Sequence, residues 1–189
     1  MQAIWPKLLI TACALLPFAS WSASLFPDRY DKEFKRAAIH LPIGTDWRLL
    51  KAQCYQESRL KPLAVSPVGA QGLCQFMPNT WREMTRKHSG LTNPWLPAHS
   101  IRAAALYMRQ LNKGWSSPRP QGERYKLALA SYNAGFGNLL KAQAKCNGAV
   151  LYAPIIHCLP DITGKHSKET IDYVRYIERY HWAMVSSAN

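Results

Sequence analysis

The stretch that decides the fold is residues 46–57, which reads DWRLLKAQCYQE. Its apolar side chains at positions 47, 50 and 54 recur at steps of three and four, the spacing of one face of an α-helix. One further step of three reaches Glu57, so the pattern places a carboxylate on the buried face of that helix. We expect the helix to end soon after Glu57, because Pro62 follows and the residue before a proline disfavours helical backbone.

The position of Glu57 predicts unusual acid–base behaviour. Burial disfavours the ionised carboxylate and raises its pKa, and the negative end of the helix dipole acts in the same direction. A carboxyl group that stays protonated near neutral pH is suited to act as a general acid. Spacing alone leaves an alternative open, in which Glu57 is a paired structural residue, because structural networks also perturb pKa values.

Four motifs in a fixed order extend the pattern around Glu57. They are YQESRL at 55–60, SPVGAQGLCQFMP at 66–78, ALASYNAG at 128–135 and ETIDYV at 169–174. Together they resemble the soluble-lytic-transglycosylase type of catalytic domain, glycoside hydrolase family 23, which has a lysozyme-like fold. Residues 46–58 look most like the catalytic module of membrane-bound lytic transglycosylases of the F type. The resemblance covers roughly residues 30–182, and four ordered motifs are far more specific than one.

The resemblance implies a chemistry and a set of site residues. Glu57 would protonate the oxygen that leaves C1 of N-acetylmuramic acid and then take the proton of that sugar's O6, so that a 1,6-anhydro bond forms without water. Intramolecular attack by O6 has the advantage of proximity. Residues that the resemblance places around the substrate are Ser58, Gln75, Tyr132, Asn133 and Tyr173. The family usually has methionine at the position of Cys74, so this chain departs from the pattern there.

Two other functions remain open on the sequence. A goose-type muramidase with the same fold would hydrolyse the bond, but it needs a second carboxylate to hold water, and the sequence identifies none. A non-catalytic wall-binding module is the alternative from a different class, and the intact Glu57 argues against it. The histidines show no metal-ligand spacing, so we expect neither a metal nor another cofactor.

The cysteines predict disulfide bonds. Four of the five cysteines follow residue 24, and an even number in an exported chain favours disulfides. Four cysteines can pair in three ways, and all three remain open. In one of them Cys146–Cys158 would close a short loop, and the family resemblance brings Cys54 and Cys74 together. Zinc is the alternative, because His157 is next to Cys158, but no close C-x-x-C pair is present.

The amino terminus and the charge indicate an exported protein with an anionic partner. One cation, Lys7, precedes an apolar run at 8–19 that is too short to span a bilayer. Small residues follow, so we expect a signal peptide at 1–24 and a single domain at 25–189. Two alternatives are a lipoprotein cleavage box at Cys13 and a retained anchor. Without residues 1–24 the chain has 23 basic and 11 acidic residues, a net charge of +12.

This excess of positive charge favours a polyanionic partner. Nucleic acid is disfavoured, because export argues against it and no nucleic-acid-binding motif is present. We expect a periplasmic or envelope-associated monomer that acts on peptidoglycan glycan strands, either alone or within a secretion, conjugation or phage apparatus.

The remaining periodicity predicts a mainly α fold with one lysozyme-like domain, a catalytic cleft and a small loop or hairpin region. We expect helices near residues 30–40, 46–57, 125–133, 138–145 and 168–185, one from 78 that ends at 88–90, and one from 100 that ends before the loop at 114–122, with a loop or hairpin at 62–72. Expected caps are Asp28, Thr45 or Asp46, Ser100 and the left-handed Gly135.

Overall fold

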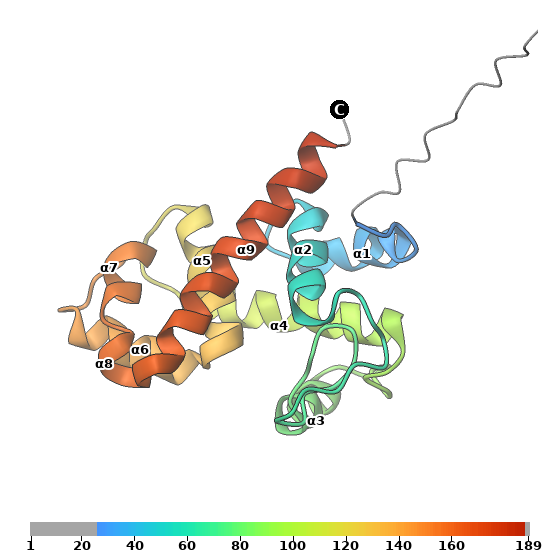
Figure 1. Cartoon of the computed structure of the whole chain (residues 1–189), viewed down its shortest axis with the longest axis horizontal. Coiled ribbons are helices and arrows are strands. Elements are labelled where there is room, and N and C mark those ends of the chain that lie inside the picture. Colours follow the sequence, from blue (N-terminus) through green and yellow to red (C-terminus); the bar gives the residue numbers. More distant parts are fainter. Residues whose placement is uncertain (1–25, 188–189) are drawn as a thin grey trace, which may run out of the picture.

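The protein is built from helices packed around one core, as the computed structural model in Figure 1 shows. The structure describes residues 26–187, so the expected signal peptide at 1–24 lies outside the described residues. The predicted mainly α fold is confirmed. The described elements, in chain order, are α1 (Asp31–Ala37), η1 (Ala38–His40), α2 (Trp47–Ser58), α3 (Pro78–Lys87), α4 (Pro97–Gly114), α5 (Gln121–Ala134), α6 (Phe136–Lys145), α7 (Tyr152–His157), α8 (Pro160–Thr163), η2 (Gly164–His166) and α9 (Ser167–Ser186).

Helix α2 begins and ends with different devices. At its start the Asp46 carboxylate accepts a hydrogen bond from the backbone N–H of Arg48 at 2.9 Å, which confirms the predicted cap. At its end two non-glycine residues, Arg59 (φ 55°) and Leu60 (φ 59°), adopt left-handed backbone. The Arg59 N–H donates to the carbonyl of Tyr55, so one of the last free carbonyls of the helix is satisfied.

Three of the expected caps are wrong in detail. Helix α4 begins at Pro97, and Ser100 is a buried residue inside it whose hydroxyl accepts the N–H of Cys74 at 3.1 Å. Proline is favoured at a helix start because its missing N–H would be unpaired there, and Pro97 is therefore the signal in the sequence for the start of α4. Helix α1 has Tyr30 as its N-cap, without a side-chain cap from Asp28. Gly135 ends α5 with positive φ but extended ψ (88°, 134°), outside the left-handed helical region.

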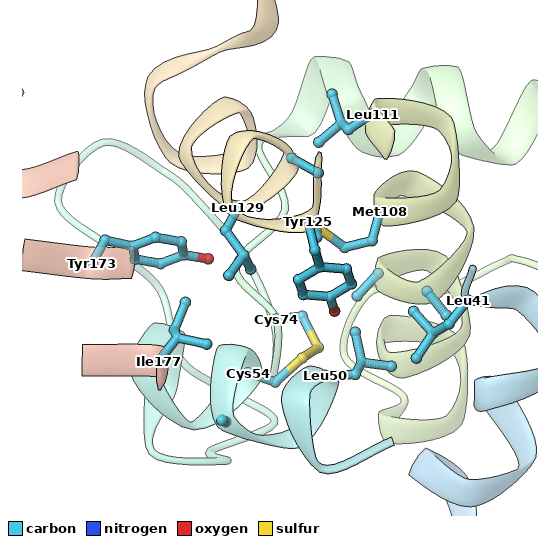
Figure 2. Close-up of a cluster of buried hydrophobic side chains, with 14 of the residues drawn as sticks. Leu41, Leu50, Cys54, Cys74, Met108, Leu111, Tyr125, Leu129, Tyr173 and Ile177 are labelled. Atoms are coloured by element: carbon cyan, nitrogen blue, oxygen red, sulfur yellow. A yellow bond between two sulfur atoms is a disulfide. The ribbon is translucent and has the colours of Figure 1, made fainter. Parts of the chain in front are cut away.

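The core lies where α2, α4, α5 and α9 meet (Figures 1 and 2). The long helix α9 crosses the molecule and packs against both α2 and α5. Figure 2 shows Leu50 and Cys54 of α2 facing Met108 of α4 and Leu129 of α5. All four side chains are at most 1% exposed, so the apolar stripe predicted for α2 is the stripe that the fold buries.

The two predicted disulfides are confirmed as Cys54–Cys74 and Cys146–Cys158. The zinc alternative is therefore wrong, because all four sulfurs are bonded in pairs. The first disulfide lies in the core (Figure 2) and joins α2 to the segment that follows it. The second lies near the surface and ties the end of α6 to the end of α7.

The segment between α2 and α3 is irregular, as predicted. Short antiparallel bridges join Gln71 to Val65 and to Phe76, so the segment folds back on itself as a small hairpin-like loop. Gly72 has φ 80°, and a Cβ atom there would lie 2.1 Å from the carbonyl oxygen of Pro94. Only glycine fits this close approach, which fixes the loop against the segment before α4.

None of the helices within residues 26–187 is long and apolar enough to cross a membrane.

Candidate active site

A cavity of about 500 Å³, lined by both polar and apolar side chains, opens beside the end of α2. Four elements form it: the last turn of α2, the loop before α3, the end of α5 and the first half of α9. Its lining residues are Gln56, Glu57, Ser66, Val68, Ala70, Gln75, Met77, Tyr132, Asn133, Glu169, Asp172, Tyr173 and Tyr176. The structure thus brings Glu57, Gln75, Tyr132, Asn133 and Tyr173, which the sequence analysis singled out, to one site.

Glu57 is a carboxyl group kept neutral by its surroundings. Burial raises its pKa, a hydrogen bond from Tyr173 lowers it, and the charge of Glu169 raises it again, so that the pKa reaches about 8. The acid is therefore mostly protonated at neutral pH, as its position in the sequence predicts. A protonated carboxyl beside an open cavity can donate a proton to a bound molecule.

Two tyrosines flank the acid in different ways. The Tyr173 hydroxyl donates to Oε1 of Glu57 at 2.5 Å, and the Tyr173 side chain comes from α9. The Tyr132 hydroxyl instead donates to the backbone carbonyl of Cys74 at 2.8 Å, so it fixes the loop rather than contacting the acid directly. Burial, with the charge of Glu57 next, raises the pKa of both tyrosines well above the usual value, so both remain neutral donors.

Gln75 is held in place by its amide nitrogen. That nitrogen donates to the carbonyls of Ala64 (3.0 Å) and Gly72 (2.8 Å), and the backbone of Gln75 is left-handed with φ 51°. A non-glycine residue in this region costs free energy and persists only where its surroundings determine it. The amide oxygen of Gln75 is the atom that remains available to accept a hydrogen bond from a ligand.

Ser58 does not line the cavity. Its hydroxyl donates to the carbonyl of Leu73 at 2.7 Å and accepts the N–H of Lys61 at 3.0 Å. Ser58 thus joins the end of α2 to the loop, and the expected contact with the reacting sugar finds no support in its geometry.

One face of α9 supplies cavity residues that the sequence analysis missed. Glu169, Asp172 and Tyr176 line the cavity together with Tyr173. The ETIDYV motif already contained both carboxylates, and steps of three, one and three place all four residues on one face of a helix. The spacing therefore indicates that these residues share a face of the helix, but it does not indicate that this face is directed toward Glu57.

The two additional carboxylates have different partners. Oε1 of Glu169 accepts the side-chain amide of Asn133 at 3.3 Å, and Asn133 in turn accepts the hydroxyl of Thr170 at 2.6 Å. Asp172 pairs with Lys168 and with Arg175, the latter at 2.8 Å. Glu169 also lines a neighbouring cavity of about 420 Å³, so it lies at the junction of two hollows.

Within residues 26–187, no group of three or more His, Cys, Asp or Glu side chains is arranged to hold a metal ion.

Comparison with known families agrees with this geometry. The profile of the Transglycosylase SLT domain family matches residues 40–149, which is more than half of the chain. The chain belongs to the SLT domain family. The match includes Glu57, Gln75, Tyr132 and Asn133, whereas the face of α9 that carries Tyr173 lies beyond the matched residues.

Curated relatives of this SLT domain carry the name membrane-bound lytic murein transglycosylase F. The protein from Alcanivorax borkumensis is 40% identical over 114 residues, which cover 60% of this chain and 23% of the relative. The protein from Pseudoalteromonas translucida is 36% identical over 155 residues, which cover 74% of this chain and 32% of the relative. The chain therefore spans only about a quarter to a third of the length of these relatives.

Solved structures share the fold. The 70 kDa soluble lytic transglycosylase of Escherichia coli is 26% identical with a TM-score of 0.67, covering 84% of this chain and 24% of that protein. An inactive Glu-to-Gln mutant of the lytic transglycosylase Slt from Pseudomonas aeruginosa is 28% identical with a TM-score of 0.64, covering 82% of this chain and 24% of that protein. The likeness confirms the lysozyme-like fold of the SLT domain.

Proposed function

We propose that the protein is a peptidoglycan lytic transglycosylase with Glu57 as its single acid and base. It would cleave the β-1,4 bond between N-acetylmuramic acid and N-acetylglucosamine and leave a 1,6-anhydro-N-acetylmuramic acid end. The observation that carries the proposal is the Glu57 carboxyl beside the cavity, which accepts a hydrogen bond from Tyr173 and whose pKa burial raises to about 8. Membership of the SLT family and the names of the relatives support it.

The chemistry needs one group that gives and then recovers a proton. In the first step Glu57 protonates the glycosidic oxygen as the bond to C1 of the muramic acid breaks. The 2-acetamido group of the sugar, or the field of the site, stabilises the positive charge that develops at C1. The Glu57 carboxylate then takes the proton of O6 while O6 bonds to C1. Glu57 ends protonated, and no water is consumed.

The neighbours of Glu57 support this cycle. Tyr173 donates to the carboxyl oxygen at 2.5 Å, and this bond would strengthen when Glu57 becomes an anion between the two steps. We assign the amide oxygen of Gln75 and the side chain of Asn133 to the sugar's polar groups, because both residues line the cavity and are held by other hydrogen bonds. Tyr132 would hold the loop that carries Gln75.

The goose-type hydrolase stays as the competing function because the cavity contains further carboxylates. Glu169 is the candidate to hold an attacking water, since it lines the cavity and its charge acts on Glu57. Asp172 is less suited to this role, because Lys168 and Arg175 already pair with it. The SLT family and the lytic transglycosylase relatives favour attack by O6 over attack by water.

The products of digestion separate these functions. Purified peptidoglycan treated with the protein should yield muropeptides with 1,6-anhydro ends, which mass spectrometry distinguishes because they are lighter than hydrolysed ends by one water. The variant Glu57→Gln is the matched control and should yield no product. Reducing muramic acid as the main product would favour the hydrolase, and Glu169→Gln should then abolish activity as well. Binding to the wall without cleavage would favour the wall-binding module.

We infer that the protein acts in the cell envelope after export. The expected signal peptide at 1–24 and the net charge of +12 that remains without it support this location. Two disulfides fit an oxidising compartment. The partners would be glycan strands of peptidoglycan, bound by a monomer, with a secretion, conjugation or phage apparatus as the setting for local wall opening. Activity in the presence of a chelator would support the expectation that no metal is needed.

A further inference from the structure

Two isoleucines stand out on the surface near the start of α2. Ile39 is 79% exposed and Ile43 is fully exposed, although isoleucine is among the residues most often buried. Ile39 lies in η1. Ile43 is at the corner of a turn in which the N–H of Thr45 donates to the carbonyl of Pro42 at 3.1 Å. Gly44, with φ 79°, supplies the backbone that such a turn requires, so the chain holds Ile43 outward.

Basic side chains lie beside η1, the element that carries Ile39. Arg36, His40 and Arg102 line a cavity of about 180 Å³ where α1 and η1 pack against α4, with Glu33 as its one acid. Burial, followed by the charges of Arg102 and Arg109, lowers the pKa of His40, so the imidazole favours its neutral form and the positive charge of this region comes from the arginines. The ion pairs found within residues 26–187 do not include Arg36, Arg102 or Arg109.

We propose that this surface, formed by Ile39, Ile43, Arg36, His40, Arg102 and Arg109, docks on an anionic phospholipid membrane. The arginines would contact lipid phosphates, while the two isoleucines enter the boundary between headgroups and acyl chains. A soluble anionic polymer could satisfy the charges but would gain nothing from isoleucines held outward. A lipid surface can bind both the positive charges and the exposed isoleucines. We therefore favour a membrane over a soluble polymer as the partner.

The geometry leaves the catalytic cavity free. Ile43 precedes α2 and Glu57 is in its last turn, so the proposed membrane surface and the acid lie at opposite ends of a 12-residue helix, about 18 Å long. Figure 1 shows α1 at the edge of the molecule, beside α2. Another group of exposed apolar residues, Leu63, Val65 and Val68, belongs to the loop beside the cleft, and Val68 lines the cavity itself. That group is assigned to the site already described.

The test measures binding of the full chain to vesicles of phosphatidylglycerol and phosphatidylcholine, against vesicles of phosphatidylcholine alone. We expect preferential binding to the anionic vesicles that weakens at about 0.5 M salt, because salt screens the phosphate contacts. Ile39→Ser with Ile43→Ser should weaken binding about tenfold or more, from the apolar area that no longer leaves water. The matched control, Leu140→Ser with Val150→Ser, changes two less exposed residues elsewhere and should bind like the unchanged chain.

Hydrogen exchange shows which segment makes the contact. Anionic vesicles should protect amides in residues 36–46, and the double isoleucine variant should lose that protection while other segments keep theirs. Equal protection by neutral vesicles, equal protection by soluble polyphosphate, or no protection of residues 36–46 would each overturn the proposal. Wall cleavage on lipid-free peptidoglycan should be unchanged in the isoleucine variant, so failure of the membrane surface is distinguishable from failure of the proposed enzyme activity.

Discussion

Helix α2 carries one carboxylate at each end, and the two behave in opposite ways. At the amino-terminal end, burial raises the pKa of Asp46, but hydrogen bonds from the Arg48 N–H, His181 and the Arg48 side chain outweigh it and leave the pKa below its usual value. At the other end, burial dominates and a single hydrogen bond from Tyr173 opposes it, so the pKa of Glu57 rises to about 8.

The difference shows that the balance between burial and hydrogen-bond donors decides the charge of a carboxyl group, because Asp46 is only partly buried and has several donors, whereas Glu57 is buried and has one. Asp46 meets the free N–H groups and the positive end of the helix dipole. Glu57 meets the negative end and one tyrosine. The same helix thus uses one carboxylate to stabilise its start and keeps the other neutral beside the cavity, where we propose that it acts as acid and base, and each end can be perturbed separately.

Removing the acid should have the largest effect. Glu57→Gln keeps shape and volume but cannot donate and recover a proton, so peptidoglycan cleavage should fall at least ~10²–10⁴-fold. Asp46→Asn is the matched control at the other end of the helix and should retain most of the activity. Turbidity of a peptidoglycan suspension measures both, and a Glu57→Gln variant that clears the suspension at the normal rate would disprove the assignment.

Removing the buried disulfide should release the carboxyl-terminal end of α2 from its loop. Replacing both Cys54 and Cys74 by alanine should lower the free energy of unfolding by ~2–4 kcal/mol. It should also reduce cleavage, because Gln75 is in the tethered loop. The matched pair, Cys146 and Cys158, closes a shorter loop away from the cavity, so its removal should spare activity. Denaturant unfolding measures the loss of stability, and cleavage assays measure the loss of activity. Equal loss of activity in both double variants would contradict a specific role of the buried disulfide in holding the loop of Gln75.

The raised pKa of Glu57 should lower the free energy of unfolding in a defined pH range. Because the folded-state pKa of Glu57 (about 8) exceeds the ordinary value of 4.5, the folded chain binds more protons between these pH values, and stability falls as pH rises through that interval. Glu57→Gln removes this term, so the variant should be more stable than the unchanged chain by roughly 1–3 kcal/mol at pH 7, and the difference should vanish near pH 4. Urea unfolding across pH tests it, and a pH-independent difference would speak against a protonated Glu57.

Changing the other end should have the opposite sign. The lowered pKa of Asp46 contributes stability above its ordinary value of 3.8, and that stability is lost as pH falls through the folded-state pKa. Asp46→Asn keeps an N-cap residue but loses charge, so at pH 7 the chain should lose about 0.5–1 kcal/mol. The same urea experiment should show the loss shrinking in acid. A loss that persists undiminished in acid would assign it to packing.

The smallest expected effect concerns the one donor at Glu57. Tyr173→Phe removes a hydrogen bond that lowers the pKa of Glu57, so that pKa should rise further. The alkaline limb of the pH–rate profile should therefore move to higher pH. Tyr132→Phe is the control, because its hydroxyl bonds Cys74 rather than the acid, and it should leave the limb in place. If the alkaline limb of the Tyr173→Phe variant moved to lower pH, the hydrogen bond from Tyr173 would raise the pKa of Glu57, contrary to the role proposed here.

Local patterns predicted the longer helices, because each buries one apolar stripe, but they missed the short helices α7 and α8, which lie where the sequence predicts a loop. The position of Glu57 on the stripe of α2 gave its burial and the direction of its pKa. The error at Ser100 has a physical cause: a hydroxyl that looks like a helix cap instead accepts the N–H of Cys74, 26 residues away.

The cavity itself could not be derived from local patterns. Tyr173 meets Glu57 across 116 residues of chain, and only the family resemblance suggested that α9 lies beside α2. Glu169 went unrecognised for the same reason, since its motif was visible but the direction of its helix face was not. Spacing predicts which residues share a face, whereas tertiary packing decides what that face meets.

The left-handed backbone of the two residues after α2 makes the end of this helix conformationally strained. Left-handed backbone costs a non-glycine residue roughly 1–2 kcal/mol. The guanidinium of Arg59 offsets part of this cost by lying 4.7 Å from the ring centre of Tyr55 and 5.1 Å from that of Tyr180. Tyr180 belongs to α9, far along the chain. A substitution of Tyr180 would weaken the packing of Arg59, which lies two residues after Glu57. Such a substitution would therefore reduce catalysis although Tyr180 does not line the cavity.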